Sequence, residues 1–247
     1  MRILLTNDDG FSSPGLLSLK KALEKDHDLW VIAPDGERSG TSHRITLRGP
    51  VMRGRVDERV FSCSGTPADC VIIGANGALP GKPELVISGI NIGPNIGTDV
   101  VYSGTAAAAR QGALMGIPSV ALSLDSFKEP FHFDALSRFA ADNLETFVRL
   151  WRPDHFININ APNLAVYRGV EITRPSRRLY HDRIDEYRAP DGRSYFFIHG
   201  FRVETVKESG SDWDAVSRGM VSISPVVLQP VPRKDDAHYR EERFVLA

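Results

Sequence analysis

Short apolar runs alternate along the chain with longer segments of helical periodicity, and this alternation predicts an α/β fold. Five runs have the length and composition of buried strands, at residues 3–5, 29–33, 85–87, 120–124 and 156–159. Strands that alternate with helices indicate a mostly parallel sheet with helices on both faces. The pattern therefore predicts a Rossmann-like core.

Four helices are expected between these strands. The first begins with Ser13 as its N-cap and Pro14 at its first position, carries leucines on one face, and ends near Lys25. A second helix begins at Thr66. The Ala-rich segment 105–115 predicts a third, and a single apolar stripe from residue 136 to residue 151 predicts a fourth.

The remaining segments have a different character. Residues 45–63 are broken by Gly and Pro in the manner of a β ribbon. Two Arg-rich and aromatic runs, 174–187 and 195–201, flank a Pro-Asp-Gly turn and predict a protruding hairpin. The tail, 224–247, is interrupted by prolines, and we expect it to dock on its own or a neighbouring subunit.

We expect these segments to form one α/β domain over residues 1–247. Its core would cover about residues 1–165, and the hairpin extension and C-terminal arm about residues 166–247.

Composition narrows the class of protein. In the 247 residues, 42% are hydrophobic and 25% charged, which is typical of a globular chain. A formal net charge of -1 argues against a stable nucleic-acid complex, and no apolar run reaches the roughly 18 residues of a membrane span. Cys63 and Cys70 match neither a zinc site nor a disulfide scaffold, which favours a reducing, cytoplasmic setting.

Polar residues collect where the predicted strands end, which is where open parallel sheets bind ligands. Asp8 and Asp9 follow the first strand, and two adjacent carboxylates repel each other unless they are solvated, protonated or bridged by a cation. Carboxylate, amide and hydroxyl oxygens suit Mg²⁺ or Mn²⁺. The alternative is a solvated acidic turn that uses Gly10.

A Gly-rich loop follows the third strand and carries Asn91 and Asn95. It leads into Ser103, Gly104 and Thr105 at the start of the Ala-rich helix, where free backbone N–H groups make an anion site. The alternatives are an asparagine-capped turn for the loop and plain N-capping for the hydroxyls, and a capping hydroxyl can serve both roles.

Ser39 and His43 suggest a nucleophilic hydrolase, but the Gly-x-Ser-x-Gly motif is absent and nothing in the sequence places the two side chains together. We therefore interpret Ser39 as an oxygen ligand or a phosphate contact. Several hairpin arginines are basic enough to touch a phosphate, although a solvated face is the default: Arg174, Arg177, Arg178 and Arg183.

Seven segments resemble the SurE family of nucleotidases in order and spacing, over nearly the whole chain. They are residues 6–10, 33–46, 64–71, 88–95, 102–105, 158–162 and 221–225. The resemblance implies a Rossmann-like core with a hairpin extension and a C-terminal segment exchanged between subunits, in a homodimer or homotetramer. It also implies a divalent-metal-dependent phosphatase of nucleoside 5′- or 3′-monophosphates, with short polyphosphate as a further substrate in some members.

By the same resemblance, one Mg²⁺ or Mn²⁺ ion per subunit is held by the residues that match the family's ligands here: Asp8, Asp9, Ser39 and Asn91. Four further positions match the phosphate side of the site: Asn95, Ser103, Gly104 and Thr105. His43 fits the pattern, but we assign it no role.

The hypothesis from the sequence is hydrolysis of a phosphate monoester, with Asp8 or Asp9 orienting a water molecule or taking its proton. An aspartyl-phosphate route stays open. One alternative is a nucleotide-binding regulatory module without catalysis, and another is an assembly protein that acts through its hairpin and tail. The preferred base, the 5′ or 3′ position and the choice between the two metals also stay open.

Overall fold

A nine-stranded sheet forms the centre of the molecule, in the order β3-β4-β2-β1-β5-β6-β7-β11-β8. The computed structural model describes residues 1–229, apart from the side chains of residues 200–202. The strands of this sheet are β1 (Arg2–Thr6), β2 (Asp28–Pro34), β3 (Arg53–Asp57), β4 (Val60–Cys63), β5 (Leu85–Ile92), β6 (Ser119–Asp125), β7 (His155–Pro162), β8 (Val170–Ile172) and β11 (Val221–Val227).

The six strands from β4 to β7 in this order are parallel, whereas β3 and β11 run antiparallel to their neighbours β4 and β7. The mostly parallel α/β sheet expected from the sequence is thus confirmed. Because the inner strands are parallel, the ends of β1, β2, β5 and β6 meet at one edge of the sheet, and this edge carries the candidate site.

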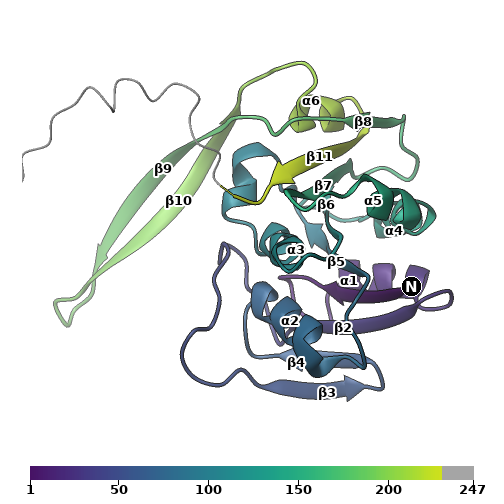
Figure 1. The fold of residues 1–247 in the computed structure, drawn as a ribbon. Coiled ribbons are helices and arrows are strands. Elements are labelled where there is room, and N and C mark those ends of the chain that lie inside the picture. Colours follow the sequence, from purple (N-terminus) through teal and green to yellow (C-terminus); the bar gives the residue numbers. More distant parts are fainter. Residues whose placement is uncertain (230–247) are drawn as a thin grey trace, which may run out of the picture.

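Helices cover both faces of the sheet (Figure 1). Helix α1 (Pro14–Leu23) packs with α4 (Phe133–Asp142) on one face, and α2 (Pro67–Ile73) packs with α3 (Gly104–Leu114) on the other. Strand β1 shows why two layers form, because Ile3 and Leu5 lie in one apolar cluster and Leu4 lies in the other. The remaining helical segments are η1 (Gly74–Ala78), η2 (Gly97–Val101), α5 (Leu144–Leu150) and α6 (Asp212–Ser217).

Side-chain hydroxyls cap the starts of two helices, and the cap at Ser13 was predicted. Ser13 Oγ accepts the N–H of Leu16 at 3.4 Å at the start of α1. At the start of α2, Thr66 and Asp69 form a reciprocal capping box, and Asp69 also accepts the N–H and hydroxyl of Thr46. The second cap therefore fastens the loop that follows β2 to the body of the protein.

Three predicted elements differ from the structure. The stripe expected as one helix is two helices, α4 and α5, separated at Asn143, whose Nδ2 donates to the carbonyl of Phe139 at 2.8 Å. The ribbon expected over residues 45–63 is confined to β3 and β4. Strand β5 continues through Ser88 to Ile92, because Gly89 adopts a φ of +140° at a bulge and its backbone approaches Leu122 closely.

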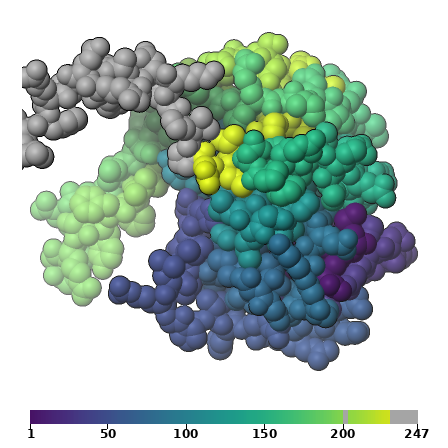
Figure 2. Space-filling view, viewed as in Figure 1, coloured from purple at the N-terminus to yellow at the C-terminus, as the bar shows by residue number. Residues whose placement is uncertain are grey.

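The predicted hairpin is present as β9 (Arg178–Arg188) and β10 (Ser194–Thr205), which pair antiparallel as a separate two-stranded sheet. It projects away from the body of the molecule, as the space-filling view also shows (Figures 1 and 2). After it, α6 and β11 return the chain to the main sheet, which the sequence pattern did not predict. Most of the expected C-terminal arm, residues 230–247, lies outside the described residues. No helix within residues 1–229 is long and apolar enough to cross a membrane.

Candidate active site

Asp8 lies at the end of β1 and is buried, with 4% of its surface exposed. Its Oδ1 accepts the hydroxyl of Thr105, and its carboxylate accepts the backbone N–H groups of Gly104 and Thr105 at the start of α3. Burial nevertheless raises the pKa of Asp8 above its usual value, because these bonds only partly replace the lost water. The carboxylate therefore sits against the positive end of a helix dipole.

Asp9 points toward the neighbouring strand, where its carboxylate accepts the backbone N–H of Ile92 in β5. Its Oδ2 is buried and has no hydrogen-bond partner among the described residues. Burial and then the adjacent charge of Asp8 raise the pKa of Asp9 to about 7. An unpartnered carboxylate oxygen beside a second buried carboxylate is a position that a cation would stabilise.

Asn91 lies beside this pair, one residue before Ile92. Its Nδ2 donates to the carbonyls of Ile92 and Gly93 at 3.2 and 2.9 Å. These bonds fix the side-chain amide and leave Oδ1 without a hydrogen bond among the described residues. An amide oxygen of this kind is a suitable ligand for a hard cation.

Ser39 comes from the loop after β2. The N–H of the preceding residue, Arg38, donates to the carbonyl of Asp8 at 2.7 Å, and an ion pair with Asp35 holds the Arg38 side chain. Ser39 itself is exposed, and its hydroxyl makes no hydrogen bond within the described part of the chain. The structure thus brings Ser39 to the same edge of the sheet without joining its side chain to the carboxylates.

Ser103, Gly104 and Thr105 form the first turn of α3. Ser103 Oγ accepts the N–H of Ala106 at 3.0 Å, so the capping interpretation holds for this hydroxyl. At Gly104, an added Cβ would lie 2.8 Å from Cβ and 2.9 Å from Oδ2 of Asp8. Only glycine therefore lets the helix end approach the carboxylate this closely.

Asn95 is buried and is held by residues of β6 and β7. Its N–H donates to Oδ1 of Asn160 at 2.8 Å, its carbonyl accepts Nδ2 of Asn158 at 2.8 Å, and its own Nδ2 donates to Ser123 at 2.8 Å. Asn158 and Asn160, which lie near the end of β7, fix the backbone of Asn95 through these bonds.

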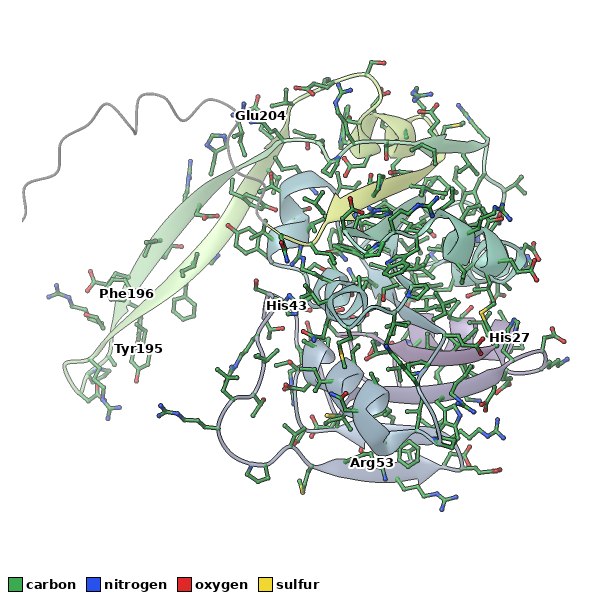
Figure 3. The ribbon with its side chains drawn as sticks, in the orientation of Figure 1. His27, His43, Arg53, Tyr195, Phe196 and Glu204 are labelled. Atoms are coloured by element: carbon green, nitrogen blue, oxygen red, sulfur yellow. The ribbon has the colours of Figure 1, made fainter. Side chains whose placement is uncertain are left out.

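His43 is not paired with Ser39. Its Nε2 lies 2.9 Å from Oε1 of Gln111 in α3. Figure 3 labels His43 on its loop. The N–H of the neighbouring Ser42 donates to the carbonyl of Tyr102 at 3.0 Å. The hydroxyl of Ser42 donates to the carbonyl of Val101 at 2.7 Å. The loop after β2 thus closes over the start of α3, and Ser39 and His43 do not form a serine–histidine pair.

Arg178 is a residue whose role the sequence pattern missed. It is half-buried rather than solvated, and it pairs with Asp99 in η2, which also accepts the hydroxyl of Tyr180. Burial, partly offset by Arg178, raises the pKa of Asp99 to about 6. No periodicity in the sequence links residues so far apart, although the abundance of arginine in this segment was visible.

The donor set at this edge consists of two carboxylates with neutral amide and hydroxyl oxygens. Within residues 1–229 no group of three or more His, Cys, Asp or Glu side chains gathers in a way that could hold a metal. A site with few charges and several neutral oxygens suits a hexacoordinate ion that keeps part of its water shell.

The chain is similar to known proteins over most of its length. A family model described as "Survival protein SurE" matches residues 3–182. The 5′-nucleotidase SurE of Thermosipho melanesiensis is 40% identical over 233 residues, which cover 92% of this chain and 91% of that protein. The corresponding protein of Pseudothermotoga lettingae is 43% identical over 233 residues, covering 92% and 89%. The crystal structure of the Aquifex aeolicus SurE protein superposes with a TM-score of 0.81 at 36% identity, covering 94% of this chain and 95% of that one.

Proposed function

The chain belongs to the survival protein SurE family and is a phosphoric monoester hydrolase, and we propose that it hydrolyses nucleoside 5′- and 3′-monophosphates with one bound divalent ion, Mg²⁺ or Mn²⁺. Short polyphosphate presents a similar terminal phosphate and belongs among the substrates to be tested. The observation that carries the proposal is the buried pair Asp8 and Asp9 at the end of β1, with Oδ2 of Asp9 left without a partner.

The residues at this edge fit a divalent ion. Asp8 and Asp9 supply the negative charge, and within residues 1–229 neither Oδ1 of Asn91 nor the Ser39 hydroxyl makes a hydrogen bond. All four ligands are oxygens, as Mg²⁺ and Mn²⁺ prefer. When bound, such an ion would polarise the phosphoryl group and activate a water molecule for attack.

The phosphate would lie against the start of α3. The positive end of the α3 dipole and the hydroxyl of Ser103 lie at this edge, beside Gly104 and Thr105. Asn95 has a backbone fixed by β7, and within the described residues only one of its two Nδ2 hydrogens is used, toward Ser123. These groups favour the charge that spreads over the phosphoryl oxygens in the transition state. Because the surrounding hydrogen bonds hold them in place before substrate arrives, little reorganisation is needed.

The two carboxylates have different tasks. Asp8 is fixed by Thr105 and by the helix N–H groups, so its carboxylate is positioned to hold a ligand. Asp9 has one unpartnered oxygen and a pKa of about 7, so in the protein without metal it takes up or releases a proton near neutral pH. We assign Asp8 to binding and Asp9 to orienting the attacking water or accepting its proton.

The experiment that tests the function is metal-dependent phosphate release from nucleoside 5′- and 3′-monophosphates. The assay is run with the native protein and with Asp8→Asn.

The hairpin supports a further proposal, that the chain forms a homodimer or homotetramer through β9 and β10. Both strands expose large apolar side chains although no other part of the described chain covers them: Ile184, Tyr187, Phe196, Phe197 and Ile198. Tyr195 and Phe196 lie near the tip, far from the main sheet (Figure 3). Exposed apolar area of this extent is typical of a protein–protein contact.

For the compartment, we propose the cytoplasm. Cys63 and Cys70 are both buried as free thiols, which suits a reducing environment.

A further inference from the structure

Phe127 lies in the loop after β6, at the same edge of the sheet as the candidate site. With 76% of its surface exposed it is among the most exposed large apolar residues of the described chain. A single exposed apolar side chain is ordinary on a protein surface, so exposure alone carries no meaning. Phe127 differs from the other exposed apolar residues because its ring packs against a loop of the candidate site.

The ring of Phe127 packs on Gly93, the residue midway between Asn91 and Asn95. A Cβ at position 93 would lie 2.2 Å from Cε1 and 2.5 Å from Cζ of the ring, so only glycine allows this contact. Gly93 is itself fixed, because its N–H donates to the carbonyl of Leu124 at 3.0 Å. The aromatic ring is therefore placed over the loop that carries one proposed metal ligand and one proposed phosphate contact.

The turn that presents Phe127 is also closed. The hydroxyl of Ser126 donates to the carbonyl of Lys128 at 2.8 Å, and the N–H of Lys128 donates back to that hydroxyl at 3.1 Å. The N–H of Ser126 is bound to the carbonyl of Leu124 at 2.8 Å. These bonds hold the backbone on both sides of Phe127, and the ring lies against Gly93 with most of its surface open to solvent.

Tyr102 is the other exposed aromatic residue beside the site, one residue before Ser103. Its ring contacts Tyr180 edge to face at 5.9 Å, and the hydroxyl of Tyr180 is bound to Asp99. Tyr102 therefore belongs to the contact that joins β9 to η2. Phe127 has no aromatic partner among the described residues, which leaves its face available to a ligand.

A nucleoside monophosphate carries its base one sugar ring away from the phosphate, and every base offers an aromatic face. We propose that Phe127 is the platform on which the base of the substrate stacks, an inference that rests on the proposed nucleotidase function. Stacking on an apolar ring does not read hydrogen bonds, so it would accept all bases while favouring the larger purines.

Two product inhibitors separate the base from the phosphate. Adenosine carries the base without the phosphate, whereas inorganic phosphate has no base. With adenosine 5′-monophosphate as substrate, Phe127→Ala should raise KM and the inhibition constant of adenosine about tenfold, as expected for loss of one stacking contact. The inhibition constant of phosphate should change by less than about twofold, since the groups proposed to bind phosphate are untouched.

Two further variants control the experiment. Phe127→Tyr keeps an aromatic face, and it should keep the inhibition constants of adenosine and of phosphate within about twofold of the native values. Ile172→Ala removes a side chain that is 67% exposed on β8, at the far edge of the sheet, and should leave both unchanged. An unaltered adenosine constant in Phe127→Ala, a phosphate constant raised as much as that of adenosine, or no inhibition of the native protein by adenosine would each overturn the inference.

Failure of the proposed function has a different signature. Native protein that releases no phosphate from adenosine 5′-monophosphate contradicts nucleotidase activity itself. In that case calorimetric titration of native and Phe127→Ala protein with the same nucleotide still decides whether the ring binds a base. Equal affinities reject the platform, and a weaker affinity of the variant supports it.

Discussion

At the scale of single residues, the account depends on how the protein tolerates two adjacent buried carboxylates. Asp8 accepts a hydrogen bond from the hydroxyl of Thr105 and is contacted by the start of α3. Asp9 accepts the N–H of Ile92, and its Oδ2 has no hydrogen-bond partner among the described residues. Hydrogen bonds therefore satisfy only part of the pair. A bound cation would supply the rest, and without one the pair favours a shared proton.

Metal binding should depend on pH because protons and cations compete for the same pair. The pKa of Asp9 is about 7 in the folded protein and 3.8 in the unfolded chain, so folding favours the protonated carboxyl. The stability that the protonated carboxyl contributes is lost as pH rises through 7. The rise in Tm on adding Mg²⁺ or Mn²⁺ should therefore be small at pH 5 and grow toward pH 8. Equal shifts at both pH values, measured by calorimetry, would contradict the assignment of Asp9 as a ligand.

The hydroxyl of Thr105 should matter through its bond to Asp8. Thr105→Val keeps the shape but removes a donor to a buried carboxylate, so kcat/KM should fall by about 10- to 100-fold. Loss of this bond also raises the pKa of Asp8 further, and the acid limb of the pH–rate profile should move to higher pH.

Thr105→Ser is the matched control for this variant, because it keeps the hydroxyl. It should stay within a few-fold of native activity with an unshifted profile. If Thr105→Val behaves like Thr105→Ser, the hydrogen bond has no part in the reaction.

At the scale of elements, the site follows from the ends of parallel strands and from the turn that leads into α3. The sequence predicted these features because each is local: a short apolar run, a polar turn after it, and an N-cap before an Ala-rich segment. The four proposed ligands come from three loops, after β1, after β2 and at the end of β5, and parallel pairing is what brings these loops to one edge.

The sequence could not predict contacts that depend on tertiary structure. The pairing of Arg178 with Asp99 joins residues 79 positions apart, and neither has a local motif that signals the other. The break at Asn143 was missed because the apolar stripe continues through it while the backbone does not. Strands β8 and β11 are short or interrupted by Pro225, so no period-two pattern marks them.

Asp212 illustrates how an element is fastened through one buried side chain. At the start of α6 it accepts the N–H groups of Gly97 at 2.7 Å, Ser176 at 2.9 Å and Trp213 at 2.8 Å. Asp212→Asn replaces an acceptor with a donor that faces N–H groups, so stability should fall by about 1–3 kcal/mol. The measurement is urea unfolding of the variant beside the native protein.

Asp214→Asn is the control, two residues away in the same helix. Its carboxylate pairs with Arg218, whose side chain is 48% exposed, and an exposed pair contributes about 0–1 kcal/mol. Equal destabilisation by the two variants would contradict the role of Asp212 in fastening α6 to η2 and to Ser176, which precedes β9.

At the scale of the whole molecule, the hairpin is an extension that the main sheet does not need. Its two strands pair only with each other, and its apolar side chains face solvent within the described chain. Such a surface is costly in a monomer and stabilising between subunits.

Replacing Ile184, Phe196 and Ile198 together by Ser should therefore lower the mass in solution measured by light scattering. Val166→Ser, which alters a side chain that is 81% exposed outside the hairpin, should not change it. Native protein that is monomeric at micromolar concentration, or a triple variant of unchanged mass, would remove the hairpin from the account of assembly.

The most direct test of the central claim is phosphate release from a panel of nucleoside 5′- and 3′-monophosphates and short polyphosphate. Each substrate is assayed with Mn²⁺, with Mg²⁺ and with EDTA, for the native protein and for Asp8→Asn. The account predicts release that requires a metal and falls by more than about 100-fold in the variant, whose fold is checked by its unfolding transition. Full activity in EDTA or in Asp8→Asn would contradict the assignment of the site, and no release by folded native protein would instead favour a nucleotide-binding module.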